Sequence, residues 1–171
     1  ELEEGLSFGP ISKLLHRWHI SEPAQTSPHP TDWVPGAALM IRREVFEKIG
    51  LLDEYFFLYF EEVDFCLWAK QAGFPCWYVP ESRVIHLVGQ ASGVTSARPG
   101  RRPRYWFESR ARFWLKHYGS FHKLCSDIAW AGGRFLFHLR SLIQRKPNPY
   151  PPHLLPDFVR FNFGSRDAWK H

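Results

Sequence analysis

Residues 55–73 read YFFLYFEEVDFCLWAKQAG, a run of aromatic and aliphatic residues that ends in three acids. A buried strand does not tolerate three carboxylates at its end. The first turn of a helix does, because its free N–H groups and its dipole attract negative charge. We therefore expect a helix that begins near Glu61, keeps apolar residues at helical spacing as far as Ala72, and is closed by Gly73.

The three acids, Glu61, Glu62 and Asp64, have two interpretations. As ordinary helix-start residues they need no further explanation. That reading leaves the long aromatic run before them unexplained. A carboxylate held at a helix start against an apolar wall is rigid and partly dry, and it can accept a proton from a substrate hydroxyl within hydrogen-bond reach.

The composition indicates one globular domain with a substantial core. The chain has 171 residues, 17% of them aromatic, and a formal net charge of +5. Its three cysteines show neither zinc-site spacing nor a disulfide framework, which favours a reducing compartment and a cytoplasmic location. No run of about 18 uncharged apolar residues is present, so no membrane-spanning helix is expected.

The remaining pattern predicts an α/β fold, with short strands and flanking helices. Strands are expected at 33–41 (WVPGAALMI), 74–80 (FPCWYVP) and 82–86 (SRVIH). Helices are expected at 42–50, at 105–119 ending in Gly119, and at 120–145 with a break at Gly132 and Gly133. Irregular structure is expected in the Pro-rich loop 21–33 and in 148–156 (NPYPPHLLP), because proline interrupts regular elements.

Two further features have competing interpretations. His86 ends the apolar segment 82–86, where a histidine is either a hydrogen-bonded structural residue or a metal ligand. The second feature is a basic stretch that suits a diphosphate, an anionic membrane, nucleic acid or simply solvent. Its members are Arg98, Arg101, Arg102, Arg104, Arg110, Arg112 and Lys116.

The order of these motifs resembles the C-terminal half of family 2 glycosyltransferases, and is most similar to the bacterial rhamnosyltransferase-like branch. The resemblance covers about residues 33–119. Its elements are a G-A-x-L-x-x-R-R segment at 36–43, a G-x-x-D-E-x-F-F segment at 50–57, the acid cluster, the Y-V-P strand and the strand-ending histidine. It implies the C-terminal part of a GT-A fold, with a short mixed sheet and flanking helices.

The resemblance also implies an inverting sugar transfer from a nucleotide-diphospho-sugar to a saccharide or lipid-linked acceptor in cell-surface polysaccharide synthesis. The family's Glu-Asp pair falls on Glu61 and Glu62, and Glu62 takes the position of the general base. Glu62 replaces the usual Asp, and its extra methylene adds about 1.5 Å of reach. Asp64 matches the next acid of the family, with a role in orienting the helix start or binding the acceptor.

Other site residues are carried over in the same way. Trp33, Gly36 and Ala37 fall where the donor and acceptor sugars meet. Ser92, Arg104 and Arg110 fall where a segment closes over the diphosphate. His86 matches a position that completes the shell of a divalent metal, Mg²⁺ or Mn²⁺, in several relatives. The other metal ligands are expected from an N-terminal half.

That N-terminal half is not recognisable here, because the chain has neither an Asp-x-Asp motif nor the alternating pattern of a nucleotide-binding βαβ unit. We expect three parts: an N-terminal segment and Pro-rich loop (1–32), the acceptor-side half of the catalytic domain (33–119), and a basic, helical and Pro-rich extension (120–171). The chain is expected to be a fragment, a truncated product or a half that works with another chain, and to be inactive alone.

Two alternatives remain open. The chain could be a non-catalytic binding or assembly module derived from the same fold, and the surface exposed by the missing half would then favour a homo-oligomer. The helical region 120–145 mixes apolar and basic residues, as interfacial helices do, and this allows peripheral contact with the inner face of the cytoplasmic membrane. Nucleic-acid binding is not expected, because no recognised module is present.

Overall fold

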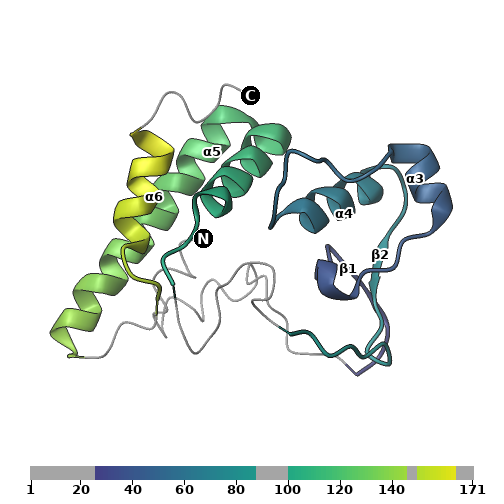
Figure 1. The fold of residues 1–171 in the computed structure, drawn as a ribbon, viewed down its shortest axis with the longest axis horizontal. Coiled ribbons are helices and arrows are strands. Elements are labelled where there is room, and N and C mark those ends of the chain that lie inside the picture. Colours follow the sequence, from purple (N-terminus) through teal and green to yellow (C-terminus); the bar gives the residue numbers. More distant parts are fainter. Residues whose placement is uncertain (1–25, 88–99, 146–149, 165–171) are drawn as a thin grey trace.

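The computed structural model describes residues 26–87, 100–145 and 150–164. These residues form two parts that lie side by side (Figure 1). The first part contains β1 (His29–Thr31), the 3-10 helix η2 (Gly36–Ala38), α3 (Arg43–Ile49), α4 (Glu61–Gln71) and β2 (Cys76–Tyr78). The second part contains α5 (Arg104–Ile143) and α6 (Leu154–Phe163).

The helices α3 and α4 pack through a small apolar core. Val45, Phe65 and Ala69 are buried there, and the rings of Phe46 and Phe65 lie 5.4 Å apart. Both helices begin and end close to the predicted residues. The chain leaves α4 through Gly73, whose φ of 90° lies in the left-handed region that glycine enters without steric cost.

The strands agree less well with the sequence. β1 and β2 pair antiparallel with Pro30 opposite Trp77, so only the predicted strand at 74–80 is confirmed. The segments 33–41 and 82–86 are not strands, whereas β1 lies in the predicted loop. A strand requires a hydrogen-bonded neighbour, and the described residues place none beside these two segments. Their apolar side chains are left outside, with Met40 97% and Ile85 94% exposed.

The long helix α5 is bent into a hairpin at Gly119, where the sequence predicts a helix end. Gly119 has φ 77° and ψ 176°, which breaks the helix. The two halves then run back along each other, since Trp106 contacts Trp130 and Arg110 contacts Asp127. The predicted break at Gly132 and Gly133 is wrong, because both lie inside the continuous second half.

The helix α6 closes the second part of the molecule. Phe107, Trp130, Leu154 and Phe158 form its buried core, and the rings of Trp130 and Phe158 stack at 4.1 Å. The helix begins inside the Pro-rich segment predicted to be irregular. Pro156 fits there because it lies in the first helical turn, where an N–H has no helical partner in any case.

In the part of the chain that the structure describes, no helix combines the length and the apolar character needed to cross a membrane.

Candidate functional site

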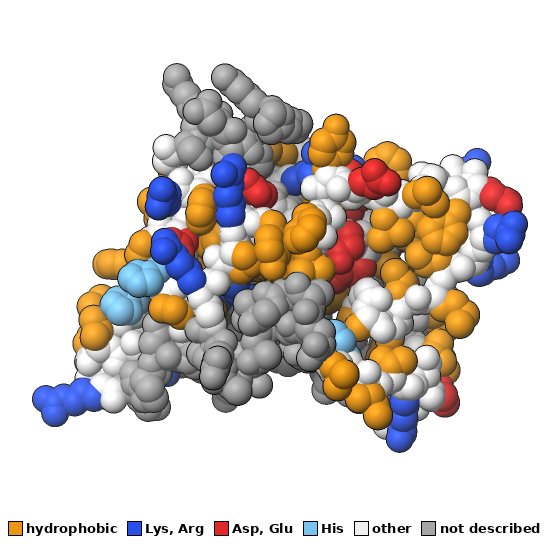
Figure 2. Space-filling model, viewed as in Figure 1, with side chains coloured by type: hydrophobic (Ala, Val, Ile, Leu, Met, Phe, Trp, Pro, Cys, Tyr) orange, Lys and Arg blue, Asp and Glu red, His pale blue; other side chains and the backbone are white. Residues whose placement is uncertain are grey.

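The candidate site lies at the start of α4, where Glu61, Glu62 and Asp64 occupy the first turn as predicted. Figure 2 shows acidic side chains at the surface between the two parts of the molecule. The two residues before the helix, Tyr59 and Phe60, both have φ of 70°. Left-handed backbone costs on the order of 1–3 kcal/mol per non-glycine residue, so surrounding contacts must hold this entry in place.

The aromatic run before the acids supplies those contacts. Three ring pairs join the run to α5: Phe57 with Tyr105, Tyr59 with Tyr105, and Phe60 with Phe113. In addition, the hydroxyl of Ser109 donates a hydrogen bond of 3.1 Å to the carbonyl of Leu58. The aromatic run therefore fixes the start of α4 against α5, which accounts for the apolar residues that a simple helix start leaves unexplained.

Glu62 is half-buried and lies against η2. A Cβ added at Gly36 would lie 3.7 Å from the Cβ of Glu62, so the structure brings these two predicted residues together. Burial raises the pKa of Glu62 above its ordinary value of 4.5; its own backbone N–H lowers the pKa, and the charge of Glu61 raises it. A carboxylate with a raised pKa is a stronger base.

The carboxylates of Glu61 and Glu62 are incompletely paired. The Oε2 atom of each is buried and has no hydrogen-bond partner among the described residues. Buried polar atoms are nearly always hydrogen-bonded, because each unpaired one costs about 1–3 kcal/mol or more. Unpaired buried carboxylate oxygens are what a site built to accept a proton or a hydroxyl group would show.

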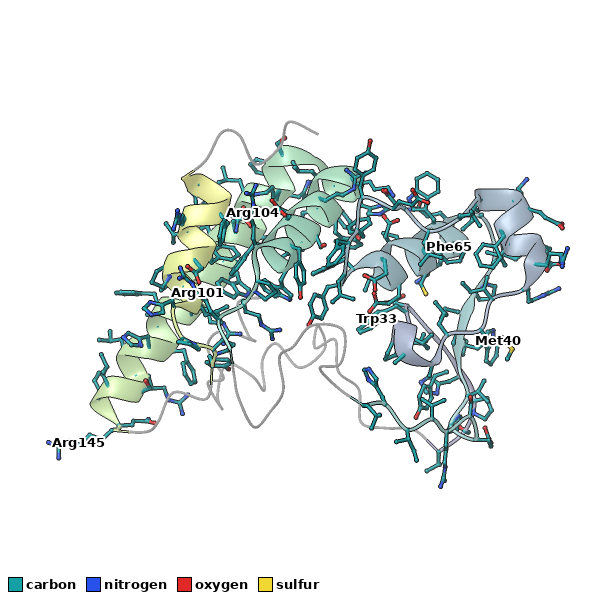
Figure 3. The ribbon with its side chains drawn as sticks, in the orientation of Figure 1. Trp33, Met40, Phe65, Arg101, Arg104 and Arg145 are labelled. Atoms are coloured by element: carbon teal, nitrogen blue, oxygen red, sulfur yellow. The ribbon has the colours of Figure 1, made fainter. Side chains whose placement is uncertain are left out.

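Trp33 and Ala37, the predicted sugar contacts, lie on either side of Gly36. Trp33 is 36% exposed and lies next to η2, below the N-terminal end of α4 in the view of Figure 3. Ala37 is exposed within η2. The predicted group Trp33, Gly36, Ala37 and Glu62 is therefore local to one edge of the first part.

The two best-formed cavities of the described residues are not lined by Glu62. One, of about 190 Å³, lies between α4 and Lys116 and is lined in part by Asp53 and Trp68. The other, of about 330 Å³, lies between the end of α5 and residues 150–156. The surface beside Glu62 and η2 is therefore separate from both of these cavities.

Asp64 is placed differently from the other two acids. It is buried, and its two oxygens accept hydrogen bonds from Lys116 Nζ at 2.8 Å and from His117 Nε2 at 2.7 Å. Both oxygens are therefore engaged by α5. This geometry supports the helix-orienting role that the sequence suggested, and leaves Asp64 no free oxygen for a proton transfer.

Sequence reasoning missed Asp53, and it did not predict that Arg112 and Lys116 of the basic stretch bind this carboxylate. Asp53 accepts hydrogen bonds from Lys116 at 2.9 Å and from Arg112 at 2.9 Å. The guanidinium of Arg112 also lies over the ring of Tyr55. The sequence pattern that could have indicated this pairing is the i, i+4 spacing of Arg112 and Lys116, which places both cations on one face of α5.

We expect the variant Asp53→Asn to lower the free energy of unfolding at neutral pH by about 1–2 kcal/mol. Burial raises the pKa of Asp53, but the hydrogen bonds from Lys116 and Arg112 outweigh it and lower the pKa from 3.8 to about 2. Because the folded pKa lies below the unfolded one, the stabilisation is complete above about pH 4 and is lost as the pH falls toward about 2.

Urea denaturation of both proteins across this pH range measures the effect. The neighbouring exposed carboxylate gives a matched control, since Glu54→Gln is expected to change little. A stability difference between wild type and Asp53→Asn that stays constant from neutral to acid pH would show that the ion pairs do not cause it.

The predicted diphosphate-binding residues are not brought together. Arg104 is exposed at the start of α5 and pairs with Glu108. Arg110 is 1% exposed, donates to Asp127 at 2.5 Å and to Ser126, and lies over Phe158. The structure therefore places Arg110 in the helical core, which differs from the predicted contact with a diphosphate. Ser92 lies outside the described residues.

His86 is exposed on the segment that follows β2. Among residues 26–87, 100–145 and 150–164, no three His, Cys, Asp or Glu side chains converge into a possible metal site. The described residues alone therefore do not fit a divalent metal, and His86 could supply at most one of its ligands.

The match to a family model decides the relationship of this chain to known proteins. The model of glycosyltransferase-like family 2 matches residues 12–111, which are 100 of the 171 residues. The chain belongs to glycosyltransferase family 2. The matched region includes η2, α3, α4 and the start of α5, and so contains the whole candidate site of this family 2 chain.

The family 2 chain is similar to three bacterial enzymes. It is 35% identical over 72 residues to the N-acetylglucosaminyl-diphospho-decaprenol L-rhamnosyltransferase of Mycobacterium tuberculosis, covering 42% of this chain and 24% of that enzyme. For the rhamnosyltransferase WbbL of Escherichia coli the identity is 34% over 57 residues, covering 33% and 22%. For the dTDP-rhamnosyl transferase RfbF of Shigella flexneri it is 28% over 79 residues, covering 46% and 26%.

These matches span about a quarter of the length of each relative. No solved structure matches the chain.

Proposed function

We propose that this chain is the acceptor-side, catalytic-base half of an inverting glycosyltransferase, with Glu62 as the base. The observation that carries the proposal is the state of Glu62. It is half-buried, its pKa is raised, and one of its oxygens is buried without a hydrogen-bond partner among the described residues. Such a carboxylate suits the removal of a proton near neutral pH.

In the proposed reaction, a carboxylate oxygen of Glu62 accepts the proton of an acceptor hydroxyl as that oxygen attacks the anomeric carbon of the donor sugar. The new C–O bond forms on the face opposite the leaving group. The bond from the anomeric carbon to the nucleoside diphosphate breaks, and the diphosphate leaves with the electron pair. The configuration at the anomeric carbon is therefore inverted.

The names of the relatives support the choice of substrates. One acts as a dTDP-rhamnosyl transferase, and another transfers rhamnose to an N-acetylglucosaminyl-diphospho-decaprenol. By analogy, we propose a nucleotide-diphospho-sugar donor and a saccharide or lipid-linked acceptor in cell-surface polysaccharide synthesis. Trp33 and Ala37 are then positioned to contact sugars beside Glu62, while Arg104 and Ser92 remain proposed contacts of the diphosphate.

The donor side of the site is proposed to come from a region absent from the described fold, which would complete a GT-A sheet. Apolar segments within the family-matched region support this, because Met40, Val84 and Ile85 are exposed among the described residues. Mg²⁺ or Mn²⁺ binding would require ligands from that region, with His86 as a candidate additional ligand. A cytoplasmic location with peripheral membrane contact is proposed for the same protein.

A transfer assay tests the proposal. Radiolabelled sugar transfer from dTDP- or UDP-sugars to a lipid-linked acceptor is expected when this chain is joined to its donor-binding region, and not with the 171 residues alone. Calorimetry provides a second measurement, since the chain alone is expected to show no tight binding of these donors. Tight, metal-dependent donor binding by the isolated chain would refute the division of the site into two halves.

A further inference from the structure

The second half of α5 has an unusual distribution of side chains. Its outward face has an apolar stripe, defined as Phe121, Leu124, Ile128, Phe135, Leu139 and Leu142, all of which are at least 46% exposed. The intervals of three, four and seven residues place them on one side of a helix, along about 30 Å. Hydrophobic side chains are visible along the outer edge of the helical part in Figure 2.

The inward face of the same helix is mostly polar. Its buried residues are Lys123, Ser126, Asp127, Trp130, Gly133, Arg134 and Ser141. An ordinary surface helix has the opposite arrangement, with apolar residues inside and polar residues in water. In the second half of α5, the polar side chains are buried inside the protein, and the apolar side chains of the stripe face outward. Such a contiguous exposed patch indicates a surface that is covered in use.

The charges around the stripe favour a negatively charged binding partner. From Ser109 to Gly164 the sequence contains only two carboxylates, Asp127 and Asp157, and both are buried. The helical part thus presents no acidic side chain along this whole region. Exposed cations are present on the same helical part instead: Arg145 points away from the molecule at the end of α5 (Figure 3), and Arg160 is exposed on α6.

The position of the stripe separates it from the surface assigned to the donor half. The family model ends at residue 111, and the stripe begins at Phe121, after the bend at Gly119. The exposed apolar residues near η2 and β2 lie within the family-matched region, whereas the stripe does not. Three of its six residues are leucines, a residue type that is under-represented among the hot spots of protein interfaces.

We propose that the second half of α5 docks this protein on an anionic lipid bilayer. The helix lies parallel to the surface with the apolar stripe in the acyl-chain boundary, and Arg145 and Arg160 contact lipid phosphates. The bend at Gly119 directs the stripe outward, because the buried pair of Arg110 and Asp127 fixes the opposite face of the helix against the rest of the hairpin. This inference rests on the peripheral membrane contact included in the proposed function and names the surface that makes it, and it does not depend on the transfer reaction.

Vesicle flotation with the 171-residue chain tests the proposal. Binding is expected to vesicles of phosphatidylcholine with phosphatidylglycerol, and to be at least about tenfold weaker with phosphatidylcholine alone, since each surface cation contributes about 1 kcal/mol near an anionic leaflet. The double variant Arg145→Gln, Arg160→Gln is expected to lower binding to the anionic vesicles by a similar factor.

The variant Ile128→Asp, Leu139→Asp tests the stripe itself and is expected to weaken binding by about a hundredfold, because two apolar side chains no longer enter the bilayer. Ile85→Asp, Leu87→Asp is the matched control. It replaces the same residue types with the same charge on a surface outside the stripe that is more exposed than the stripe itself, and it is expected to bind like the wild type. Circular dichroism checks that both variants fold.

Three results would overturn the proposal: no flotation of the wild type with anionic vesicles, unchanged flotation of Ile128→Asp, Leu139→Asp, or an equal loss in the control. Sedimentation without lipid adds a fourth. A stable dimer that the stripe variant converts to a monomer would assign the stripe to a second copy of this chain. Because no sugar transfer is measured, failure here leaves the proposed reaction standing, and failure of that reaction leaves membrane docking standing.

Discussion

Replacing Glu62 with Gln is expected to lower the rate of sugar transfer by about 10²–10⁴-fold in the protein that combines this chain with its donor-binding region. The amide has nearly the same size as the carboxylate and cannot accept the acceptor's proton. The substitution therefore removes the base and leaves the packing against Gly36 intact. Initial rates at saturating donor and acceptor measure the effect.

The same variant is expected to be at least as stable as the wild type at neutral pH. Burial raises the pKa of Glu62 in the fold, so ionisation of this group above pH 4.5 opposes folding. Removing the charge removes that cost, and the difference should vanish below about pH 4 as the wild-type carboxyl becomes protonated. A site residue that costs stability and supports activity is a known trade-off.

Two control variants make the result specific. Glu61→Gln changes the neighbouring carboxylate by the same chemistry and is expected to retain more transfer than Glu62→Gln. Glu44→Gln changes an exposed carboxylate on α3 that pairs with Arg42, and should have no effect. A larger loss for Glu61→Gln would move the base to position 61, and full activity of both glutamine variants at the α4 start would eliminate the proposed mechanism.

The sequence predicted the features of this fold that depend on local interactions. The acids of α4, the end of α3 at Gly50 and the bend at Gly119 are all determined by residues near them in the chain. The proximity of Gly36 and Glu62 was not predicted as a contact, although the resemblance assigned both residues to one site. The strands at 33–41 and 82–86 were predicted wrongly because a strand depends on a neighbouring strand, and apolar composition does not reveal whether one is present.

The basic stretch shows the same limit for charged residues. The sequence left both an anion-binding and a solvated surface open, but Arg101 pairs with Asp157, Arg110 with Asp127, and Arg112 with Asp53. Each of these carboxylates lies at least 17 positions away in the sequence. Pairings at such separations are set by the hairpin and by α6. A cation that binds a buried carboxylate cannot be distinguished by sequence pattern from one that binds a ligand.

The buried pair of Arg110 and Asp127 gives the second large prediction. Asp127 has no exposed surface, accepts a hydrogen bond of 2.5 Å from Arg110, and also binds Lys123. Asp127→Ala would remove a buried carboxylate that two cations contact inside the hairpin. Removing one member of a buried pair costs about 3–5 kcal/mol, so we expect a loss of that size in the free energy of unfolding.

A loss of about 3–5 kcal/mol is a large share of the 5–15 kcal/mol typical of a domain, and denaturant unfolding at neutral pH measures it. Asp32→Ala is the control, because it removes an aspartate from an ion pair with Lys70 that is largely exposed, and it should change stability little. A comparable loss in both variants would show that burial does not govern the effect.

The double variant Arg110→Met, Asp127→Leu distinguishes two causes of the stability loss in Asp127→Ala. One cause is the burial of cations that have lost their carboxylate partner, and the other is the loss of a favourable ion pair. If Asp127→Ala lowers the free energy of unfolding because it leaves cations buried without that carboxylate, replacing both partners by apolar side chains should restore much of the stability. The double variant has no charge to desolvate at these two positions. Lys123 is 11% exposed at its side chain and also contacts Asn162, so it can turn its charge toward water. A double variant as unstable as Asp127→Ala would show instead that the pair is itself the main stabilising interaction of the hairpin. In that case the outward direction of the apolar stripe would depend directly on this one buried ion pair.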